Sequence, residues 1–380
     1  MTTPLPHKPK SAHLQDLYRG CLLGGAVGDA LGAPVEFMSR AQILRTFGPA
    51  GIENYAPAFG KLGAITDDTQ MTLFTAEGLM RGWVRGNRRG GLCHMPSVIS
   101  LAYQRWLHTQ GERHRLHDED CLNGWLIGPR ELFARRAPGL TCLSGLQGMR
   151  QSGDMAQNNS KGCGGVMRVA PIGMFYASLA RANPANQGGL RREAFDLGCQ
   201  AAAITHGHAT GQLASGALAA MVLELLQGAS LLQAIDAVLP ILRAQRGHEE
   251  TLLALEAACR LASQRPRDAQ VLAQLGEGWI AEEALAIGVY CALSATDFPS
   301  GVALAVNHSG DSDSTGSIAG QLLGAMLGAR AIPRHWLGPL ELRGVIEEMA
   351  DDLATLMEWS LEGDDSPEDV DYYAHKYPGF

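Results

Sequence analysis

Two short acidic segments, one near each end of the chain, carry the residue types with the clearest chemistry. They are TDDT at 66–69 and GDSDSTG at 310–316, and each stands directly before an apolar run with helical spacing. Together they supply carboxylates flanked by hydroxyl groups. Ligand sets made only of oxygen select hard cations such as Mg²⁺, Mn²⁺ or Ca²⁺. The pattern therefore predicts a site for divalent cations.

Two other interpretations of these segments compete with a metal site. Asp, Ser and Thr at a helix start cap free backbone N–H groups and favour the positive end of the helix dipole. Capping would explain one acid per helix, but each segment holds a pair. The second segment also fits the start of an EF-hand calcium loop, yet Leu322 stands where that loop needs a bidentate glutamate.

Apolar residues recur at helical spacing through most of the chain, and alternation of apolar and polar residues is almost absent. The segments with helical spacing are 14–31, 69–84, 95–108, 193–205, 210–227, 230–244, 249–263, 281–294, 314–329 and 340–360. This pattern predicts an all-α protein. Because the two acidic segments need each other to complete a metal site, they indicate a single domain.

Glycine recurs at every fourth position in two of these segments. The rows are Gly20, Gly24, Gly28 and Gly32, and then Gly316, Gly320, Gly324 and Gly328. Each glycine inside a helix costs about 1 kcal/mol relative to alanine, so such rows need a compensating reason. We expect both helices to be buried with their backbones in close approach, against each other. A general bias toward small residues is the alternative.

Composition excludes several classes of protein. The net charge of −8 argues against a nucleic-acid groove, which needs a concentrated basic patch. Eight cysteines without a CxxC pair, and no export signal, indicate reduced thiols in the cytoplasm. The most apolar stretches are too short to cross a bilayer, so no membrane partner is expected.

The chain divides into one large domain and two short ends. Residues 1–13 hold three prolines and few large apolar groups, which predicts a flexible arm. Residues 14–362 form the helical domain, and 363–380 form a C-terminal tail. Within the domain, 137–165 is expected to be the longest loop, and NPANQGG at 183–189 a surface insertion.

Five segments, in order along the chain, resemble the ADP-ribosylglycohydrolase family. They are RGCLLGGAVGDALGAPVEF at 19–37, ITDDTQMTLFTAEGL at 65–79, SKGCGGVMRVAPIG at 160–173, THGHATGQLASGALAAMV at 205–222 and NHSGDSDSTGSIAGQLLGA at 307–325. The resemblance covers the chain from Leu17 to about Gly328. It implies a single orthogonal all-α helical bundle with a binuclear metal cleft, and two divalent cations, Mg²⁺ or Mn²⁺, as cofactors.

The resemblance also assigns residues to the metal site. The implied ligands are Thr66, Asp67, Asp68, Asp311, Asp313 and Ser314. Ser314 is commonly Thr in the family, and the hydroxyl group is kept. Glu36 matches an acidic residue that in some relatives contacts the metal site or acts in catalysis, although by itself it reads as a surface charge after a helix. The implied catalytic carboxylates are Glu36, Asp67, Asp68, Asp311 and Asp313, and which of them moves the proton stays open.

A glycine-rich segment is the implied binding site for ADP-ribose. Its backbone amides would face the diphosphate or the ribose, as in an anion-binding nest. The implied contacts are Ser160, Gly162, Gly164, Gly165 and His206. Taken alone, the glycines predict a turn equally well, and a lone histidine at a helix start is more often structural. Cys163 stands where many relatives have Asn, and we do not interpret it as a nucleophile.

The implied reaction releases ADP-ribose from a modified protein side chain. Cleavage at the anomeric carbon develops oxocarbenium character, and the leaving group needs a proton. A pair of cations can orient ribose hydroxyls and lower the pKa of a water molecule. Arginine is the expected acceptor, with serine and others open. The alternative is an immunity protein that binds an ADP-ribosyltransferase toxin directly, with the arm at 1–13 reaching its cleft.

Overall fold

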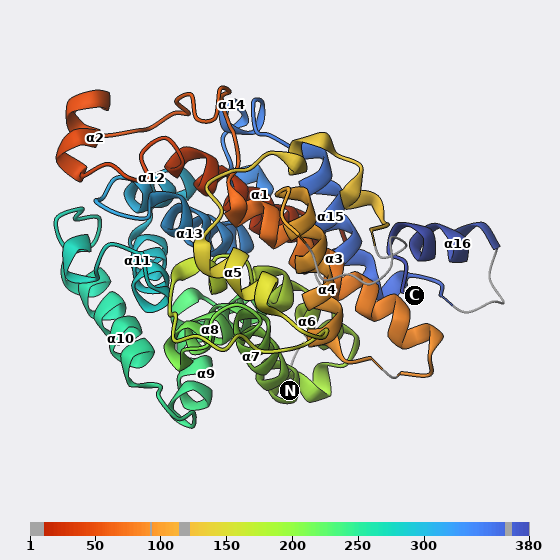
Figure 1. Cartoon of the computed structure of the whole chain (residues 1–380). Coiled ribbons are helices and arrows are strands. Elements are labelled where there is room, and N and C mark those ends of the chain that lie inside the picture. The colour runs from red at the N-terminus through yellow and green to blue at the C-terminus, as the bar shows by residue number, and fades with distance from the viewer. Residues whose placement is uncertain (1–10, 92, 114–121, 362–366, 380) are drawn as a thin grey trace.

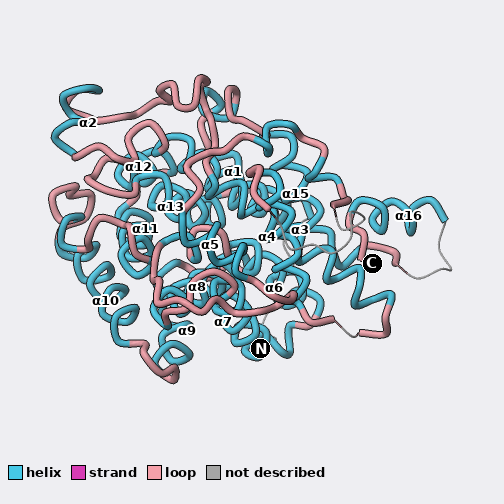
Figure 2. The backbone as a smooth tube through the Cα atoms, in the orientation of Figure 1, coloured by secondary structure: helices cyan, strands magenta, loops and turns pink. Residues whose placement is uncertain are grey.

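The computed structural model describes residues 11–91, 93–113, 122–361 and 367–379. Helices dominate these ranges, and within them the chain forms no strand (Figure 2). The β-type pairings in this part of the chain are isolated bridges, Ala58 with Lys61 and Gly162 with Ile280. The prediction of an all-α protein is confirmed.

The α-helices are numbered α1 to α16 in their order along the chain (Figure 1). The α-helices are α1 (Ser11–Gly32), α2 (Arg40–Phe47), α3 (Asp67–Arg88), α4 (Met95–Thr109), α5 (Leu140–Gly148), α6 (Ala170–Ala182), α7 (Gln187–Ala203), α8 (Ala209–Leu226), α9 (Leu231–Arg243), α10 (Glu249–Gln264), α11 (Ala281–Ser294), α12 (Phe298–Val306), α13 (Ser312–Leu327), α14 (Arg334–Leu337), α15 (Arg343–Thr355) and α16 (Pro367–Lys376). Short 3₁₀ helices are η2 (Trp125–Ile127), η3 (Arg130–Phe133), η4 (Cys163–Gly165), η5 (Pro184–Asn186), η6 (Leu272–Gln274), η7 (Ala329–Ala331) and η8 (Leu356–Glu358).

Most predicted helices begin and end within two or three residues of the observed ones, and the exceptions have local causes. The expected long loop at 137–165 contains α5, whose Leu143 and Leu146 are buried. Its glycine, serine and glutamine content hid this helix from the sequence pattern. The expected insertion at 183–189 instead forms η5 and the first turn of α7. Helices α2, α6, α12, α14 and α16 were also missing from the prediction.

The two glycine rows lie against each other, as predicted. Helices α1 and α13 pack in opposite directions, so that Gly20 faces Gly324, Gly24 faces Gly320 and Gly28 faces Gly316. A methyl group on any of these glycines would overlap a backbone carbonyl of the opposite helix. The lost helix propensity is therefore offset by an interhelical contact that no larger residue permits.

This packing fixes which helix ends meet. Because α1 and α13 run antiparallel, the C-terminal end of α1 lies beside the N-terminal end of α13, where Gly32 contacts Asp313. The colours of Figure 1 show the two helices, red and blue, side by side in the centre of the molecule, with α3 beside them. Residues from the beginning and end of the sequence therefore share one site.

Both ends of the chain depart in part from the prediction. Residues 1–10 lie outside the described residues, but residues 11–13 of the expected arm belong to α1. The expected tail contains α16, and Tyr377 directly after it is fully buried. The Tyr377 hydroxyl donates to Asp352 on α15, and the Lys376 ammonium bonds the same carboxylate. This end of the chain is part of the packed structure.

The expectation that every apolar stretch is too short to cross a bilayer was wrong for two segments, Cys163–Ala182 and Ala209–Leu226, which are long and apolar enough by composition. In the fold, 78% and 89% of their most apolar windows are buried. The second segment is α8, which packs against α6, α7, α9 and α11. A helix that is apolar on all sides is expected in such a central position.

Candidate functional site

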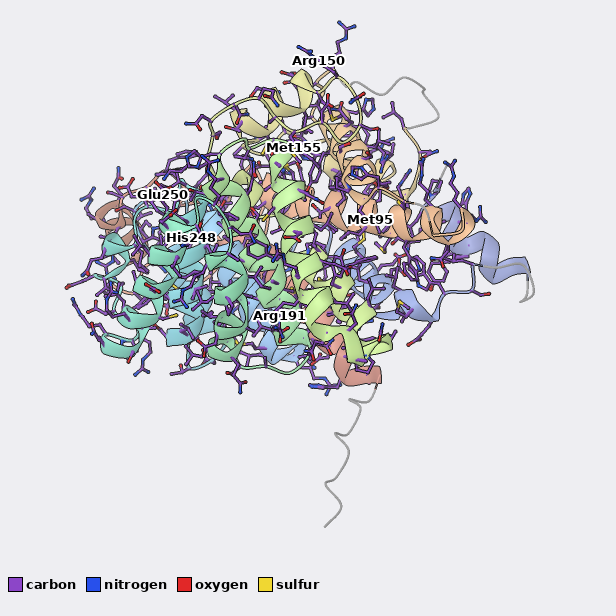
Figure 3. The ribbon with its side chains drawn as sticks, turned by 90° about the horizontal axis from the view of Figure 1, so that it is seen from below. Met95, Arg150, Met155, Arg191, His248 and Glu250 are labelled. Carbon is purple, nitrogen blue, oxygen red and sulfur yellow. The ribbon has the colours of Figure 1, made fainter. Side chains whose placement is uncertain are left out.

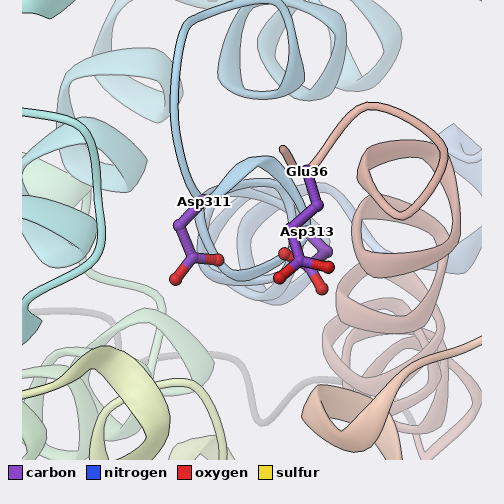
Figure 4. Close-up of side chains that lie close together, drawn as sticks. All are labelled: Glu36, Asp311 and Asp313. Carbon is purple, nitrogen blue, oxygen red and sulfur yellow. The ribbon is translucent and has the colours of Figure 1, made fainter. Parts of the chain in front are cut away.

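The N-terminal end of α13 brings three carboxylates together. One oxygen from each of Glu36, Asp311 and Asp313 lies within 4.8 Å of the others. Figure 4 shows the carboxyl groups of Glu36 and Asp313 pointing into the same space, with Asp311 beside them. Glu36 comes from the segment that follows α1, so the antiparallel packing of α1 and α13 is what assembles the group.

The second acidic segment begins α3. Thr66 is the N-cap, and its hydroxyl accepts from the backbone N–H of Asp68 at 3.3 Å. The Asp67 carboxylate accepts from the backbone N–H of Gly139 at 3.2 Å. Charge on Asp311 acts on both Asp67 and Asp68, which puts the ends of α3 and α13 in one electrostatic environment.

A buried aspartate of α1 holds this end of α3 in place. The Asp29 carboxylate is fully buried and accepts from the backbone N–H groups of Thr66 and Thr69, and also from the Thr69 hydroxyl. Hydrogen bonds to a charged acceptor are roughly twice as strong as neutral ones. Helix α1 therefore positions both acidic segments, one through its glycines and one through Asp29.

Crowding and burial disfavour negative charge throughout the site. Burial, followed by the charges of Asp311, Asp67 and Asp29, raises the pKa of Glu36 to about 8. Burial raises the pKa of Asp67 to about 8, against the Gly139 N–H bond, which lowers it. Burial also raises the pKa values of Asp68 and Asp313 well above the usual range. A bound cation would remove this penalty.

Helix capping explains only part of the acidic segments. Thr66 caps α3, and Asp311 caps α13 by accepting from the backbone N–H of Ser314 at 3.3 Å. The Asp68 oxygen Oδ1 is buried and has no hydrogen-bond partner. A buried carboxylate oxygen without a donor is costly unless a cation neutralises it. The all-oxygen donor set and this orphaned oxygen fit a hard divalent cation.

The glycine-rich segment is fastened to the loop that precedes α11. The backbone N–H of Cys163 donates to the Trp279 carbonyl at 3.1 Å, and the N–H of Ala281 donates to the Lys161 carbonyl at 2.9 Å. The same loop reaches the carboxylates, because the Asp311 N–H donates to the Glu277 carbonyl at 2.8 Å. One loop thus connects the predicted nucleotide site with the predicted metal site.

Lys161 tethers the glycine-rich segment from its other side. Its ammonium group lies 2.7 Å from Glu250 on α10 and 2.5 Å from Glu282 on α11. Figure 3 shows Glu250 near His248, at the start of α10. Surface ion pairs contribute little stability singly, but this group joins three separate parts of the chain.

Among the predicted substrate contacts, His206 is buried, whereas Ser160 is partly exposed. A methyl group added to Gly162, Gly164 or Gly165 would lie within 3.5 Å of the His206 ring, and His206 is 1% exposed. Burial, followed by the charge of Arg168, lowers the His206 pKa to about 3. His206 therefore supports the glycines from the buried side as a neutral ring. The Ser160 hydroxyl, in contrast, is partly exposed and accepts from the Gly162 N–H.

A surface cavity of about 830 Å³ adjoins the same segment. Its lining includes Met149, Arg150, Met155 and Asn158, and Figure 3 shows Arg150 and Met155 at one end of the molecule. None of the site carboxylates lines it. Asn158 connects the cavity to the glycine-rich segment, since its side chain accepts from the Ser160 N–H.

Two exposed aromatic rings stand at the edge of the carboxylate group. Phe37, directly after Glu36, is 75% exposed and stacks on Trp279, with ring centroids 5.5 Å apart and an angle of 21°. The Trp279 carbonyl is the one that binds Cys163. An exposed pair of large aromatic rings beside buried acids is typical of a surface that binds a ligand.

Sequence reasoning missed Asp29, Lys161 and Trp279 as parts of the site. An acid inside the apolar run of α1 was a signal for Asp29, since buried acids are rare unless paired. Lys161 and Trp279 gave no such signal, because their partners come from distant segments.

Comparison with known proteins identifies the class. Residues 10–362 match the family described as ADP-ribosylglycohydrolase. A solved structure titled "ADP-ribosylglycohydrolase-related protein complex" has the same fold, with a TM-score of 0.63 and 29% identity, over 91% of this chain and 99% of that one. The chain belongs to the ADP-ribosylglycohydrolase family, and it is a hydrolase of glycosyl bonds.

Similar proteins with assigned names agree with this class. The ADP-ribosyl-[dinitrogen reductase] glycohydrolase of Rhodospirillum rubrum is 29% identical over 87% of this chain and 92% of its own length. The ADP-ribosylarginine hydrolase Tri1 of Pseudomonas putida is 24% identical over 89% of this chain and 78% of its own. The family and these names support removal of ADP-ribose from modified proteins.

Proposed function

We propose that this protein removes ADP-ribose from modified arginine side chains and depends on two divalent cations, Mg²⁺ or Mn²⁺. The observation that carries the proposal is the group of Glu36, Asp311 and Asp313, whose oxygens lie within 4.8 Å of one another beside the end of α3. The residues that would hold the ions are Thr66, Asp67, Asp68, Asp311, Asp313 and Ser314. When bound, such ions supply charge stabilisation and an activated water molecule.

Among the carboxylates of the site, Glu36 is the best placed to exchange a proton with the substrate. The four aspartates of the acidic segments are buried, whereas Glu36 is partly exposed. Its pKa of about 8 lets it hold a proton near neutral pH in the metal-free protein. Glu36 would therefore protonate the leaving nitrogen, and the aspartates would position the ions.

The edge of the site favours arginine as the acceptor. A guanidinium group is a planar cation that stacks on aromatic faces and is attracted by carboxylates. Phe37 and Trp279 offer exposed rings beside Glu36. An acceptor serine would present a small neutral oxygen with nothing to stack. The name of one relative above, an ADP-ribosylarginine hydrolase, points the same way.

The test compares two peptides modified with ADP-ribose, one on arginine and one on serine, and measures free ADP-ribose. We expect faster release from arginine, loss of release with a chelator, and recovery on adding Mg²⁺. Faster release from serine would contradict the acceptor assignment. Release that resists complete metal removal would contradict the metal dependence.

Two variants sharpen this test. Glu36→Gln keeps the size of the side chain and should lower the rate by about 100-fold or more, as expected for loss of a general acid. Asp236→Asn removes an exposed acid on α9 and serves as the control, with the rate unchanged.

A further inference from the structure

The thiol of Cys163 lies inside the carboxylate site. Cys163 begins η4 in the glycine-rich segment, and its Sγ donates to the Asp311 oxygen Oδ2 at 2.7 Å. The charge of Asp68, on the opposite helix, also acts on this thiol, and so does the hydroxyl of Ser314. The sulfur atom therefore contacts a predicted metal ligand, the cap residue of α13, and is influenced by a second one on α3.

Core packing does not explain this position. Cys21 and Cys291 are fully buried among apolar side chains, and Cys142 contacts the Gly164 carbonyl and the Arg168 guanidinium. Among the cysteines in the described part of the chain, Cys163 is the one whose sulfur bonds a carboxylate. Burial, followed by the charge of Asp311, raises its pKa well above the usual range, so it is a poor nucleophile in the metal-free protein.

An independent observation points to a cation beside this thiol. Asp68 is 2% exposed, and its oxygen Oδ1 has no hydrogen-bond partner. Electrostatic interactions connect Asp68 with Asp311 and with Cys163. A buried carboxylate oxygen without a donor is costly, and a cation bound between Asp68 and Asp311 would neutralise it.

We propose that Cys163 is a sulfur ligand of the metal centre, through which this site binds a thiophilic divalent cation such as Zn²⁺ in competition with Mg²⁺. Soft thiolate ligands favour Zn²⁺ over Mg²⁺, whereas carboxylates alone favour Mg²⁺. On coordination a metal–sulfur bond replaces the S–H bond, and the proton passes to the buffer.

The inference rests on the metal centre of the proposed function but not on its substrate. The first test titrates the metal-free full-length protein with Zn²⁺ and with Mg²⁺ by calorimetry. Cys163→Asn should lower Zn²⁺ affinity by about tenfold or more, the range for losing part of a metal site, while Mg²⁺ affinity stays nearly unchanged. Cys259→Ser, a partly exposed thiol on α10, is the matched control.

A spectroscopic test distinguishes a ligand from a structural hydrogen bond. With Co²⁺ as the probe, the natural protein and the Cys259→Ser variant should show thiolate-to-metal charge-transfer absorption, and Cys163→Asn should lack it. A thiol that only orients Asp311 would give no such band, and its loss would lower Zn²⁺ and Mg²⁺ affinity equally. Either result overturns the proposal.

A second variant and the choice of a binding assay keep the proposal testable. Cys163→Ser, with a smaller change in shape, replaces the Asn variant if that protein melts at a lower temperature than the natural one. Failure of the arginine-linked substrate assay leaves the binding results intact, because no substrate is used. A natural protein that binds neither Mg²⁺ nor Zn²⁺ would overturn this inference together with the metal centre of the proposed function.

Discussion

The N-terminal ends of α3 and α13 are similar in sequence but are held in different ways. Each begins with a polar cap, Thr66 or Asp311, and each presents further carboxylates to the same site. Helix α13 is fixed by backbone contact along the whole glycine row of α1. Helix α3 is fixed mainly at its tip, by hydrogen bonds to one side chain, Asp29.

This difference shows how one helix can position two others. Backbone contact leaves α13 no room to shift, so the spacing of Glu36, Asp311 and Asp313 is set by packing. The hydrogen bonds between Asp29 and the N-terminal end of α3 orient this helix, so that its carboxylates lie near those of α13. The site therefore depends on the glycine contact and on the Asp29 hydrogen bonds. Separate substitutions can disrupt each of them.

Loss of a proposed metal ligand from the N-terminal end of either helix should have the largest effect. Replacing Asp67 or Asp313 by Ala should lower hydrolysis by about 100-fold or more and weaken Mg²⁺ binding. Removing one of several crowded carboxylates should leave the melting temperature of the metal-free protein unchanged or slightly higher. Stability gained on adding Mg²⁺ should fall in both variants.

The capping interpretation makes the opposite prediction for these variants. Loss of a cap costs about 0.5–2 kcal/mol of stability without metal and spares catalysis. An active Asp313→Ala enzyme would rule out a shared metal centre. Melting temperatures with and without Mg²⁺, measured with release of ADP-ribose, decide between the two.

Breaking the glycine contact should have the next largest effect. Gly320→Ala places a methyl group against the Gly24 carbonyl, and neither backbone can rotate away. We expect a loss of about 3 kcal/mol or more in the free energy of unfolding, at the upper end for overpacking. Gly188→Ala in α7 meets open space and should cost nothing. Equal melting temperatures for the two variants would show that the helices can separate freely.

Weakening the tip of α3 should have a smaller effect. Thr69→Val keeps the shape but removes the hydroxyl that donates to Asp29, at a cost of about 1.5–3 kcal/mol for a bond to a charged group. Mg²⁺ affinity should fall as well, because the Asp67 and Asp68 backbone is then less firmly placed. Thr72→Val is the control, since its hydroxyl bonds mainly within α3, to the Asp68 carbonyl. Equal Mg²⁺ affinity in both variants would remove the role given to Asp29.

The smallest effect expected is a pH dependence that Mg²⁺ weakens. Glu36 and Asp67 have folded pKa values of about 8, above their unfolded values. Their contribution to stability is therefore full at low pH and lost as the pH rises through about 8. His206, with a pKa of about 3, acts oppositely, losing stability only as the pH falls below its unfolded value of 6.5.

The measurement therefore uses the range from about pH 6.5 to about pH 8.5, where His206 stays neutral. The melting temperature of the metal-free protein should fall across this range. With saturating Mg²⁺ the aspartates proposed to hold the ions stay ionised, so the fall should become smaller. A metal-free protein that becomes more stable with rising pH would contradict the crowding of these acids.

The sequence by itself determined most of the longer helices, the glycine contact and the two acidic segments. Helical spacing is a local property, and a row such as Gly20 to Gly32 is costly unless another backbone lies against it. The motif spelling also identified the family, which the comparisons confirmed. Short helices such as α5 and α12 were not predicted, because a few residues show too little of the helical periodicity.

Only the tertiary structure decided how the site is put together. The sequence could not show that Asp29 anchors α3, that Trp279 joins the glycine-rich segment to the acids, or that Cys163 faces Asp311. Each of these contacts joins residues that are far apart in the chain, and their meeting depends on how whole helices pack. Local patterns fix which elements form, whereas long-range packing fixes which side chains share a space.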